Sequence, residues 1–339
     1  MDGHIVDGLS ARKIAISGAA GFIGYHLVSK LLASNVAIGW LGDSLQPSYG
    51  GNLSVLRANS LLESLKVEEI DLASLPPEEV AERIAESRFL VHLAASPGVR
   101  AGELDPVKTF KNNVGVFQTM LAAAESAEVE AVLYASSSSV YGDAGVQGAC
   151  SEVQADGKQA KSWYATTKWI NEIQARDFTR RTGIPTVALR FFTVYGSYGR
   201  PDMAYFTFAE ALRSGQPVTI YGSNGGSRDF THVSDTVHAM SELIRVGLVH
   251  GSEILPPAVN IATGRPASTL DLVDELALNI GVSDPQITHL VRPSVDAEAT
   301  YADTELLQGL IGSWPTVGLK QGIAEFVDWW QSTSSDSSY

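Results

Sequence analysis

The chain has 339 residues, of which 45% are hydrophobic and 18% are charged, and it carries a formal net charge of −14. Length and composition suit a large folded core in one globular unit or in two closely joined domains. The negative charge and the lack of a long basic cluster argue against nucleic acid or an anionic membrane as a partner, and leave open a local basic pocket for a phosphorylated small molecule.

The N-terminal residues 1–8 include acidic side chains and no long apolar stretch, which is unlike a secretory signal. No apolar run along the sequence has the length that a membrane-spanning helix needs. Cys150 is the single cysteine, so an internal disulfide is excluded. We therefore expect a cytoplasmic protein with no membrane partner.

A glycine-rich turn follows the first predicted strand, which covers residues 13–17. Gly18, Gly21 and Gly24 lie in this turn, and a helix-like run continues over residues 25–32. Glycines at this spacing permit a tight turn, a close approach of the backbone to a pyrophosphate and close packing of the helix on the strand. The helix N-terminus adds unpaired N–H groups, so the pattern predicts a dinucleotide-binding turn.

A second apolar run, residues 36–41, is followed by Asp43. Asp43 lies about twenty residues after the glycine turn, where a carboxylate binds the ribose hydroxyls of NAD. A 2′-phosphate would meet its negative charge, and residues 44–51 contain no Arg or Lys to compensate. NAD is therefore predicted in preference to NADP.

Short apolar runs alternate with longer amphipathic runs as far as about residue 190. Residues 89–94, 131–135 and 186–190 are predicted strands, and residues 106–127 and 162–182 are predicted helices. Alternation of this kind is typical of an α/β fold with a parallel, doubly wound, Rossmann-like sheet.

The sequence becomes rich in glycine after residue 190, and two further helices are predicted over residues 233–247 and 269–281. We expect residues 1–190 to form an NAD-binding Rossmann domain that also carries the reactive side chains. Residues 191–331 are expected to form mainly a smaller substrate-binding lobe that closes over a ligand. The low-complexity segment 332–339 is expected to be a disordered tail.

Tyr164 and Lys168 are four residues apart on a predicted helix, so their side chains are neighbours. A free tyrosine has a pKa of about 10, too high for a base at neutral pH. A nearby Lys and a positively charged nicotinamide would favour the phenolate, which makes Tyr164 a candidate general base. Without the glycine turn upstream, the same pair is the pattern of an ordinary exposed helix.

Four serines, residues 136–139, follow the predicted strand 131–135. The carboxyl ends of strands in open parallel sheets bind ligands, so a serine here can hydrogen-bond a substrate hydroxyl. Some of the four are expected to bond the local backbone instead.

With these motifs the chain resembles an extended short-chain dehydrogenase/reductase of the NAD-dependent sugar-nucleotide epimerase/dehydratase family. The resemblance covers residues 13–330. It includes a His-Leu-Ala-Ala segment at residues 92–95 and an Arg-Asp-Phe segment at residues 228–230. It implies a catalytic set of Ser137, Tyr164 and Lys168. It implies cofactor contacts for Gly18, Gly21, Phe22, Ile23, Gly24, Asp43, Asp71, Leu72, Leu93, Ala94, Ala95, Asn112, Tyr164 and Lys168. It implies substrate contacts for Arg100, Ser137, Ser138, Ser139, Thr193, Arg200, Arg228 and Arg292, with Arg228 and Arg292 on the nucleotide-sugar phosphates.

Two features narrow the reaction within this family. Dehydratases carry an Asp-Glu pair, and decarboxylases that form UDP-xylose carry a Glu, where this chain has Ser138 and Ser139. Without that carboxyl group, elimination of water lacks its acid and base, whereas epimerisation needs neither. Second, Thr193 with the Gly-Arg-Pro-Asp-Met-Ala segment 199–204 resembles UDP-glucuronate 4-epimerases, as does the segment 296–303.

A sugar carboxylate suits a guanidinium fork and a hydroxyl donor, which Arg200 and Thr193 supply. The resemblance therefore implies a UDP-glucuronate 4-epimerase that works through a 4-keto intermediate with tightly bound NAD. The chain departs from the family at residues 96–97 and 197–198, near the expected sugar pocket. Alternatives are a neutral-sugar 4-epimerase, in which Arg200 pairs structurally with Asp202, a nucleotide-sugar decarboxylase, and a non-catalytic dinucleotide-binding sensor.

We expect a second copy of the chain and a small molecule as partners, and no metal. A homodimer through the helices at residues 106–127 and 162–182 is expected from the resemblance, with apolar contributions from Phe117, Trp169, Ile170 and Ile173. The seven histidines are scattered without the spacing of metal ligands, so no metal is expected. The expected small-molecule partner is a UDP-sugar.

Overall fold

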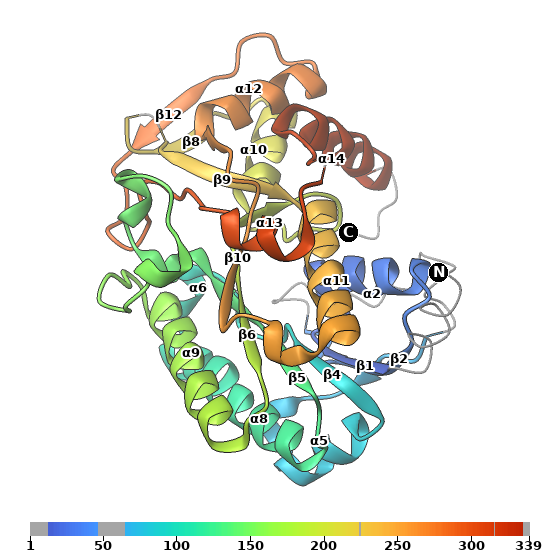
Figure 1. Ribbon diagram of the computed structural model, residues 1–339. Helices are drawn as coiled ribbons and strands as arrows, with labels where there is room; N and C mark the ends of the chain where they lie inside the picture. The colour runs from blue at the N-terminus through green and yellow to red at the C-terminus, as the bar shows by residue number, and fades with distance from the viewer. Residues whose placement is uncertain (1–12, 47–64, 224, 315, 335–339) are drawn as a thin grey trace.

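The computed structural model describes residues 13–46, 65–223, 225–314 and 316–334. A parallel seven-stranded sheet runs through the larger part of these residues, in the order β10-β6-β5-β4-β1-β2-β3 (Figure 1). Its strands are β1 (Lys13–Ser17), β2 (Ile38–Asp43), β3 (Glu68–Glu69), β4 (Ser87–His92), β5 (Ala131–Ser137), β6 (Thr186–Phe191) and β10 (Ala258–Ile261). The predicted doubly wound sheet is confirmed.

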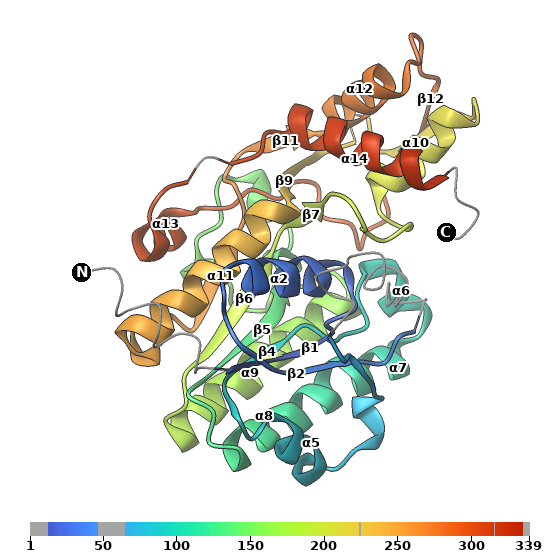
Figure 2. The ribbon, with the colours of Figure 1, turned by 90° about the vertical axis from the view of Figure 1, so that its right-hand side faces the viewer.

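Helices cover both faces of this sheet (Figure 2). One face carries α2 (Phe22–Ala33) and α11 (Val233–His250), and the other carries α5 (Pro77–Ile84), α8 (Val116–Ser126) and α9 (Trp163–Thr182). Successive strand residues point to opposite faces, so both faces of a covered strand must be apolar. In β1, Ile14 and Ile16 therefore belong to one core cluster and Ala15 to the other.

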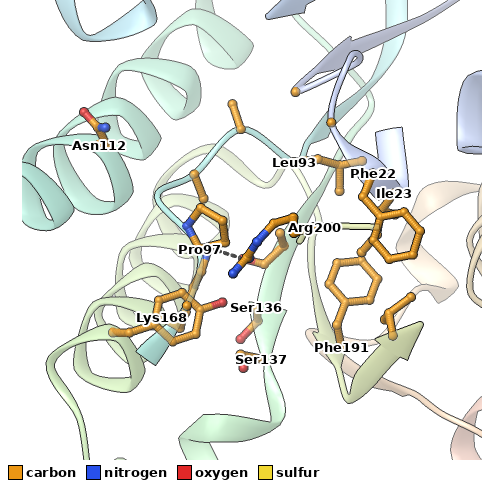
Figure 3. Close-up of a pocket in the computed structure, with 18 of the residues that line it drawn as sticks. Phe22, Ile23, Leu93, Pro97, Asn112, Ser136, Ser137, Lys168, Phe191 and Arg200 are labelled. Carbon is orange, nitrogen blue, oxygen red and sulfur yellow. Dashed lines mark hydrogen bonds between the residues drawn. The ribbon is translucent and has the colours of Figure 1, made fainter. Parts of the chain in front are cut away.

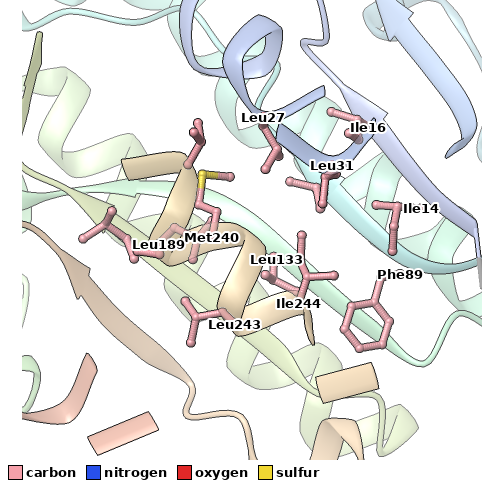
Figure 4. Packing of buried hydrophobic residues seen from close by; sticks show 14 of the residues in the cluster. Ile14, Ile16, Leu27, Leu31, Phe89, Leu133, Leu189, Met240, Leu243 and Ile244 are labelled. Carbon is pink, nitrogen blue, oxygen red and sulfur yellow. The ribbon is translucent and has the colours of Figure 1, made fainter. Parts of the chain in front are cut away.

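The first core cluster lies between the sheet and the α2/α11 layer (Figure 4). Leu27 and Leu31 of α2 are fully buried in it, as are Met240 and Leu243 of α11. Removing a large side chain of this kind from water contributes about 1.5–3 kcal/mol. The two helices are therefore held on the sheet by a shared apolar layer.

Local sequence signals set the ends of α9, the helix that carries the predicted Tyr164 and Lys168. The Ser162 side chain caps its start by accepting a hydrogen bond from the Ala165 N–H at 3.1 Å. Its end is marked by Gly183, whose φ of 78° is left-handed and favours glycine. The observed bounds differ by one residue from the predicted 162–182.

A smaller lobe lies above the carboxyl end of the sheet in Figure 1. It contains a three-stranded sheet, β11-β9-β7, and a two-stranded sheet, β12-β8. Its strands are β7 (Thr193–Tyr195), β8 (Val218–Tyr221), β9 (Ser227–His232), β11 (Pro266–Ser268) and β12 (Ile287–Leu290). Helices α10 (Ala204–Arg213), α12 (Thr269–Ile280) and α14 (Leu319–Ser334) pack around a separate apolar cluster in this lobe.

Short helices make up the remaining regular structure. They are α6 (Val99–Leu104), α7 (Pro106–Phe110), the π-helical turn η3 (Lys111–Gly115), α13 (Glu305–Ile311), and the 3-10 turns η2 (Leu72–Ser74), η4 (Ser138–Tyr141), η5 (Ala144–Val146), η6 (Glu152–Gln154) and η7 (Ser252–Ile254). The predicted single helix at 106–127 is thus divided into α7, the π-helical turn and α8. No helix in the described ranges has both the length and the apolar character needed to cross a membrane.

The chain passes between the two units more than once. Although they follow residue 190, α11 packs on α2 and β10 forms the edge of the large sheet beside β6. Helix α14 continues to Ser334, three residues into the expected tail, and residues 335–339 lie outside the described part, as do residues 1–12. Residue 190 therefore marks a change in the sequence, but segments that come after it pack in the larger unit.

Candidate active site

A cavity of about 650 Å³ lies between the carboxyl end of the large sheet and the lobe. Its walls come from both units, and the predicted residues Gly18, Asp43, Tyr164, Thr193 and Arg200 all line it. Figure 3 shows Lys168, Ser136, Ser137 and Arg200 gathered on one side and Phe22, Ile23 and Phe191 on another. The topology places this cavity where parallel sheets generally bind ligands.

The glycine turn is packed so closely that side chains do not fit. A Cβ on Gly24 would lie 2.0 Å from the Gly18 carbonyl oxygen, and a Cβ on Gly18 would lie 2.6 Å from the Ala94 nitrogen. Gly18 also has a φ of +76°, which favours glycine. No described side chain caps the start of α2, so this helix N-terminus meets the cavity as a site for an anion.

Asp43 ends β2 and is 8% exposed. Its carboxylate accepts hydrogen bonds from the backbone N–H groups of Ala20 at 2.9 Å and Leu45 at 2.8 Å. Burial raises the pKa of Asp43, and these backbone bonds act in the opposite direction. The bonds fix the orientation of this carboxylate, which lines the cavity together with the glycine turn.

The other predicted cofactor residues also border the cavity. Asp71 caps η2 by accepting a hydrogen bond from the Ala73 N–H at 3.0 Å. The cavity wall includes Phe22, Ile23, Asp71, Leu72, Leu93, Ala94, Ala95 and Asn112. A buried carboxylate that can accept hydrogen bonds from ribose hydroxyls, next to a glycine turn, fits a dinucleotide such as NAD. These residues would hold the dinucleotide.

Ser137, Tyr164 and Lys168 come together from β5 and α9. Ser137 Oγ accepts a hydrogen bond from the Ser139 N–H at 3.1 Å, which caps η4, and donates to Ser139 Oγ at 3.0 Å. Lys168 Nζ lies 5.9 Å from the centre of the Tyr164 ring and donates to the Ala135 carbonyl oxygen at 2.8 Å. The predicted reactive set is therefore assembled by one strand end and one helix.

Burial and charge act in opposite directions on these groups. The pKa of Tyr164 is raised, because burial outweighs the positive charge of Arg200 and the hydrogen bond with Ser137, which both lower it. Burial lowers the pKa of Lys168 to about 8. The site thus contains a phenol whose ionised form needs neighbouring donors and cations, both of which the structure supplies.

Arg200 and Thr193 reach the cavity from the lobe. The Arg200 guanidinium donates from Nε to Asp202 Oδ1 at 2.9 Å and from Nη2 to Asp202 Oδ2 at 2.6 Å. These bonds, together with the charge of Arg200, hold the pKa of Asp202 below its usual value although burial opposes the shift. The pair uses one edge of the guanidinium fork, which has a second edge formed by Nη1 and Nη2.

The three other predicted arginines occupy different positions. Arg228 lines the cavity and donates to the carbonyl oxygens of Ala297 at 2.7 Å and Glu298 at 3.0 Å. Arg100 and Arg292 are not among the described lining residues: Arg100 stacks on the Tyr221 ring at 4.7 Å and pairs with Asp296, and Arg292 lies 3.6 Å from Glu298. Contacts of these two arginines with a substrate stay a prediction.

The sequence departures near the pocket have structural consequences. Pro97 lines the cavity. His26 of α2 hydrogen-bonds the Ser197 carbonyl oxygen at 2.9 Å, and the Tyr198 ring lies 4.8 Å from the ring of Tyr25 and 4.9 Å from that of Trp329. The segment 197–198 therefore joins α2, next to the glycine turn, to α14 of the lobe.

Asn113 is a residue that the sequence reasoning missed. Its amide accepts from the Ser96 N–H at 2.7 Å and donates to Thr167 Oγ1 at 3.0 Å, so it ties the loop before α6 to α9. Its neighbour Asn112 lines the cavity and donates to Ser96 Oγ at 2.9 Å. The π-helical turn places these two residues, and π-helical turns occur often at functional sites. Two adjacent asparagines inside a helical run were the available signal.

The fold and site define a nucleotide-binding protein of the short-chain dehydrogenase/reductase type, with a glycine turn, an acidic ribose site and a Ser-Tyr-Lys set. The chain belongs to the NAD dependent epimerase/dehydratase family, whose model matches residues 14–261. This membership confirms the family resemblance and the NAD dependence predicted from the sequence.

Named relatives agree over nearly the whole chain. A probable UDP-glucuronate 4-epimerase of Rhizobium meliloti is 30% identical over 338 residues, covering 94% of this chain and 96% of that protein. A crystal structure of UDP-glucuronic acid 4-epimerase from Bacillus cereus with UDP-glucuronic acid and NAD has a TM-score of 0.82 at 29% identity, covering 94% and 99% of the two chains. MoeE5 has been solved with UDP-glucuronic acid and NAD and also with UDP-glucose and NAD. It is 33% identical to this chain, and the match covers 95% of this chain and 99% of MoeE5, with TM-scores of 0.79 and 0.80 for the two structures.

Proposed function

We propose that the protein is a UDP-glucuronate 4-epimerase that interconverts UDP-glucuronate and UDP-galacturonate. The observation that carries this proposal is the presence of Thr193 and Arg200 in the same cavity as Ser137 and Tyr164. A hydroxyl and a guanidinium suit a sugar carboxylate, and both reach this cavity from the lobe. The relatives named above support the choice of sugar.

Tyr164 is the group that handles the proton in this proposal. Its phenolate would take the proton of the sugar 4-hydroxyl, and the phenol would give a proton back after the sugar has turned over in the cavity. Ser137 stabilises the phenolate and hydrogen-bonds the same hydroxyl, while the charge of Arg200 favours ionisation. NAD bound beside these residues would accept a hydride from carbon 4 and return it to the opposite face of the 4-keto sugar.

The 4-keto form of this sugar is a β-keto acid, which readily loses carbon dioxide. Contacts from Thr193 and Arg200 to the carboxylate would disfavour the geometry that this loss requires. Ser138 and Ser139 also line the cavity and supply no carboxyl group for elimination of water. The residues therefore support epimerisation in preference to dehydration or decarboxylation.

One observation favours a second candidate, a neutral-sugar 4-epimerase. Asp202 already holds one edge of the Arg200 guanidinium, as that alternative predicts. In the first proposal the second edge of the fork binds the sugar carboxylate; in the second candidate Arg200 shapes the lobe alone.

Product analysis separates these candidates. The purified protein would be incubated with UDP-glucuronate and with UDP-glucose, and the products separated by chromatography. A higher kcat/KM for UDP-glucuronate with formation of UDP-galacturonate supports the proposal, and a preference for UDP-glucose supports the second candidate. Release of carbon dioxide as the main reaction would indicate a decarboxylase. Retention of NAD without turnover of either nucleotide would indicate a sensor.

We also propose a homodimer through the face formed by α6, α7 and α9, in line with the predicted helices. This face exposes Leu104 (88%), Val107 (79%), Phe110 (43%) and Ile173 (49%) on helices that contact one another. A large exposed apolar patch is typical of an interaction surface, and a two-fold dimer presents the same patch twice. Of the residues predicted to contribute, Phe117 is instead 1% exposed and packs in the core of its own chain.

Sedimentation velocity at micromolar concentration tests this dimer. Val107→Glu should convert the dimer to a monomer by placing a charge in the interface. Val153→Glu, a change at a valine elsewhere that is also mostly exposed (92%), is the control and should leave the dimer intact. A monomeric wild-type protein would remove the proposal.

A further inference from the structure

We propose that the buried pair Glu172–Arg190 is a positioning device that holds Ser137 and Tyr164 in reacting geometry. The proposal rests on the function proposed above for those two residues. Neither Glu172 nor Arg190 is among the described residues that line the cavity, so the pair would act through the elements that it joins.

The pair is buried and bidentate. Glu172 of α9 is 5% exposed and Arg190 of β6 is 3% exposed. Arg190 donates from Nε to Glu172 Oε1 at 2.9 Å and from Nη2 to Glu172 Oε2 at 2.7 Å. Two parallel bonds of this kind fix the orientation of both side chains as well as their separation.

Glu172 also bonds the strand that carries Ser137. Ser136 Oγ of β5 donates to Glu172 Oε1 at 2.7 Å, and Lys168, one turn earlier on α9, donates to the Ala135 carbonyl oxygen at 2.8 Å. Helix α9 is therefore fastened to β5 at the two residues immediately before Ser137. Tyr164 lies one further turn toward the start of the same helix, so these bonds set its position relative to Ser137.

Arg190 reaches the other end of the serine segment. Its Nη1 donates to Tyr141 Oη at 2.8 Å, and Tyr141 Oη donates to Asn260 Oδ1 of β10 at 2.7 Å. Tyr141 closes the turn η4, which follows Ser137 directly. The segment from Ser136 to Tyr141 is thus held at both ends by a single guanidinium, which acts through Glu172 at Ser136 and directly at Tyr141.

A stability role alone does not explain this arrangement. A buried ion pair is often replaceable by apolar side chains of similar volume without loss of stability, because desolvation offsets the attraction between the charges. Apolar side chains would keep the packing but could not direct hydrogen bonds to Ser136 and Tyr141. A displacement of about 1 Å between reacting groups can cost about a hundredfold in rate.

The experiment compares two double variants of the NAD-bound protein. Glu172→Met/Arg190→Leu removes the pair and keeps apolar volume. Arg88→Leu/Glu130→Met is the control, because Arg88 and Glu130 form a bidentate but partly exposed pair beside the opposite end of β5. For each protein we would measure the unfolding midpoint, bound NAD, KM and kcat with UDP-glucuronate, and the pKa of Tyr164 from an absorbance titration against Tyr164→Phe.

The variant without Glu172–Arg190 should stay folded with NAD bound, lose about a hundredfold in kcat, keep a similar KM, and show a higher Tyr164 pKa because the Ser137 hydrogen bond is weakened. The control variant should match the wild type in kcat and in the Tyr164 pKa. Equal kcat and Tyr164 pKa in the two folded double variants would overturn the proposal. The titration reports positioning even if the wild type turns over neither nucleotide, an outcome that would refute the proposed function separately.

Ser136→Ala keeps the test decisive if the double variant does not fold. It removes the bond from β5 to Glu172 and leaves the ion pair intact. The expected result is a fall in kcat relative to the wild type of less than about a hundredfold, with the unfolding midpoint close to that of the wild type. An unchanged kcat and an unchanged Tyr164 pKa in Ser136→Ala would overturn the proposal.

Discussion

The two halves of the cavity are built in different ways. The cofactor half is bounded by backbone: a Cβ added to Gly24 would lie 2.0 Å from the Gly18 carbonyl, and Asp43 is fixed by two backbone N–H groups. The half proposed to bind the nucleotide sugar is lined by long side chains from the lobe, chiefly Arg200 and Arg228, which also bond other protein groups.

This difference shows why the cofactor is easier to predict than the sugar. A backbone cradle needs glycines at set intervals in one short segment, so its requirement is visible in the sequence. A binding site made of side chains depends on which edge of an arginine guanidinium is already hydrogen-bonded to the protein. Only the folded structure shows this.

Tyr164 lies where the two halves meet, and removing its hydroxyl should affect the reaction without affecting either half. Tyr164→Phe should lower kcat by about a hundredfold or more, because a general base contributes about that much. The fold and bound NAD should be retained, measured by circular dichroism and by nucleotide released on denaturation. More than about a hundredth of the wild-type rate would contradict the role of Tyr164 as the base.

Gly24→Ala should damage the cofactor half selectively. The new methyl group would collide with the Gly18 carbonyl and force the turn away from α2, at an overpacking cost of about 1–3 kcal/mol. NAD affinity should fall by up to about a hundredfold, as measured by calorimetry on protein stripped of nucleotide. Gly115→Ala is the control, because a Cβ there meets no described atom within 4 Å. Unchanged affinity in Gly24→Ala would show that the backbone cradle is adaptable.

Arg200→Ala should damage the sugar half selectively. Loss of a charge-assisted bond of about 1.5–3 kcal/mol should lower kcat/KM for UDP-glucuronate by about ten- to a hundredfold, and affect UDP-glucose far less. A UDP-pentose by-product is also expected, since the keto acid is held less firmly. Arg213→Ala, which removes an exposed arginine paired with Glu210, is the control. Equal losses on both nucleotides would favour the neutral-sugar candidate.

Asp202→Asn should have the smallest effect, and the effect should depend on pH. The Asp202 side chain is 64% exposed, so its pairing with Arg200 is expected to stabilise the fold by less than about 1 kcal/mol. Because the folded-state pKa of Asp202 is lowered, this stabilisation is present above the unfolded-state pKa and is lost as the pH falls through the folded-state value. Denaturant unfolding should show a constant difference between wild type and variant from neutral pH down to about pH 5, and a shrinking difference below about pH 4. A difference that has already vanished at about pH 5 would contradict the lowered pKa.

Most strands before residue 191 could be predicted because each carries its own apolar signal, whereas β3, with the sequence Glu-Glu, has no such signal and was missed. Strands β1, β5 and β6 are short apolar runs covered on both faces, and their observed bounds lie within two residues of the predicted ones. The return of β10 to the large sheet could not be predicted, because its four residues look like any short apolar run and their partner, β6, lies far away in the sequence. Long-range pairing of this kind is a property of the whole fold.

Site residues that are close in the sequence could be predicted, whereas contacts between distant elements could not. Tyr164 and Lys168 are one helical turn apart, so local spacing alone makes them neighbours. Arg100 gave no local signal that it would stack on Tyr221 rather than face the cavity, because that contact joins α6 to the distant strand β8. The link between Glu172 and Arg190 was likewise hidden, since it joins a helix to a strand across a buried interface.

The interleaving of the chain between the sheet and the lobe bears on how the molecule comes apart. A fragment ending at residue 190 would lack α11, so Leu27 and Leu31 of α2 would lose the apolar layer that Met240 and Leu243 provide. Such a fragment would expose this apolar surface to water and would tend to aggregate. The two units are therefore expected to melt in a single cooperative transition, and a protease that cuts in the lobe would destabilise the cofactor half as well.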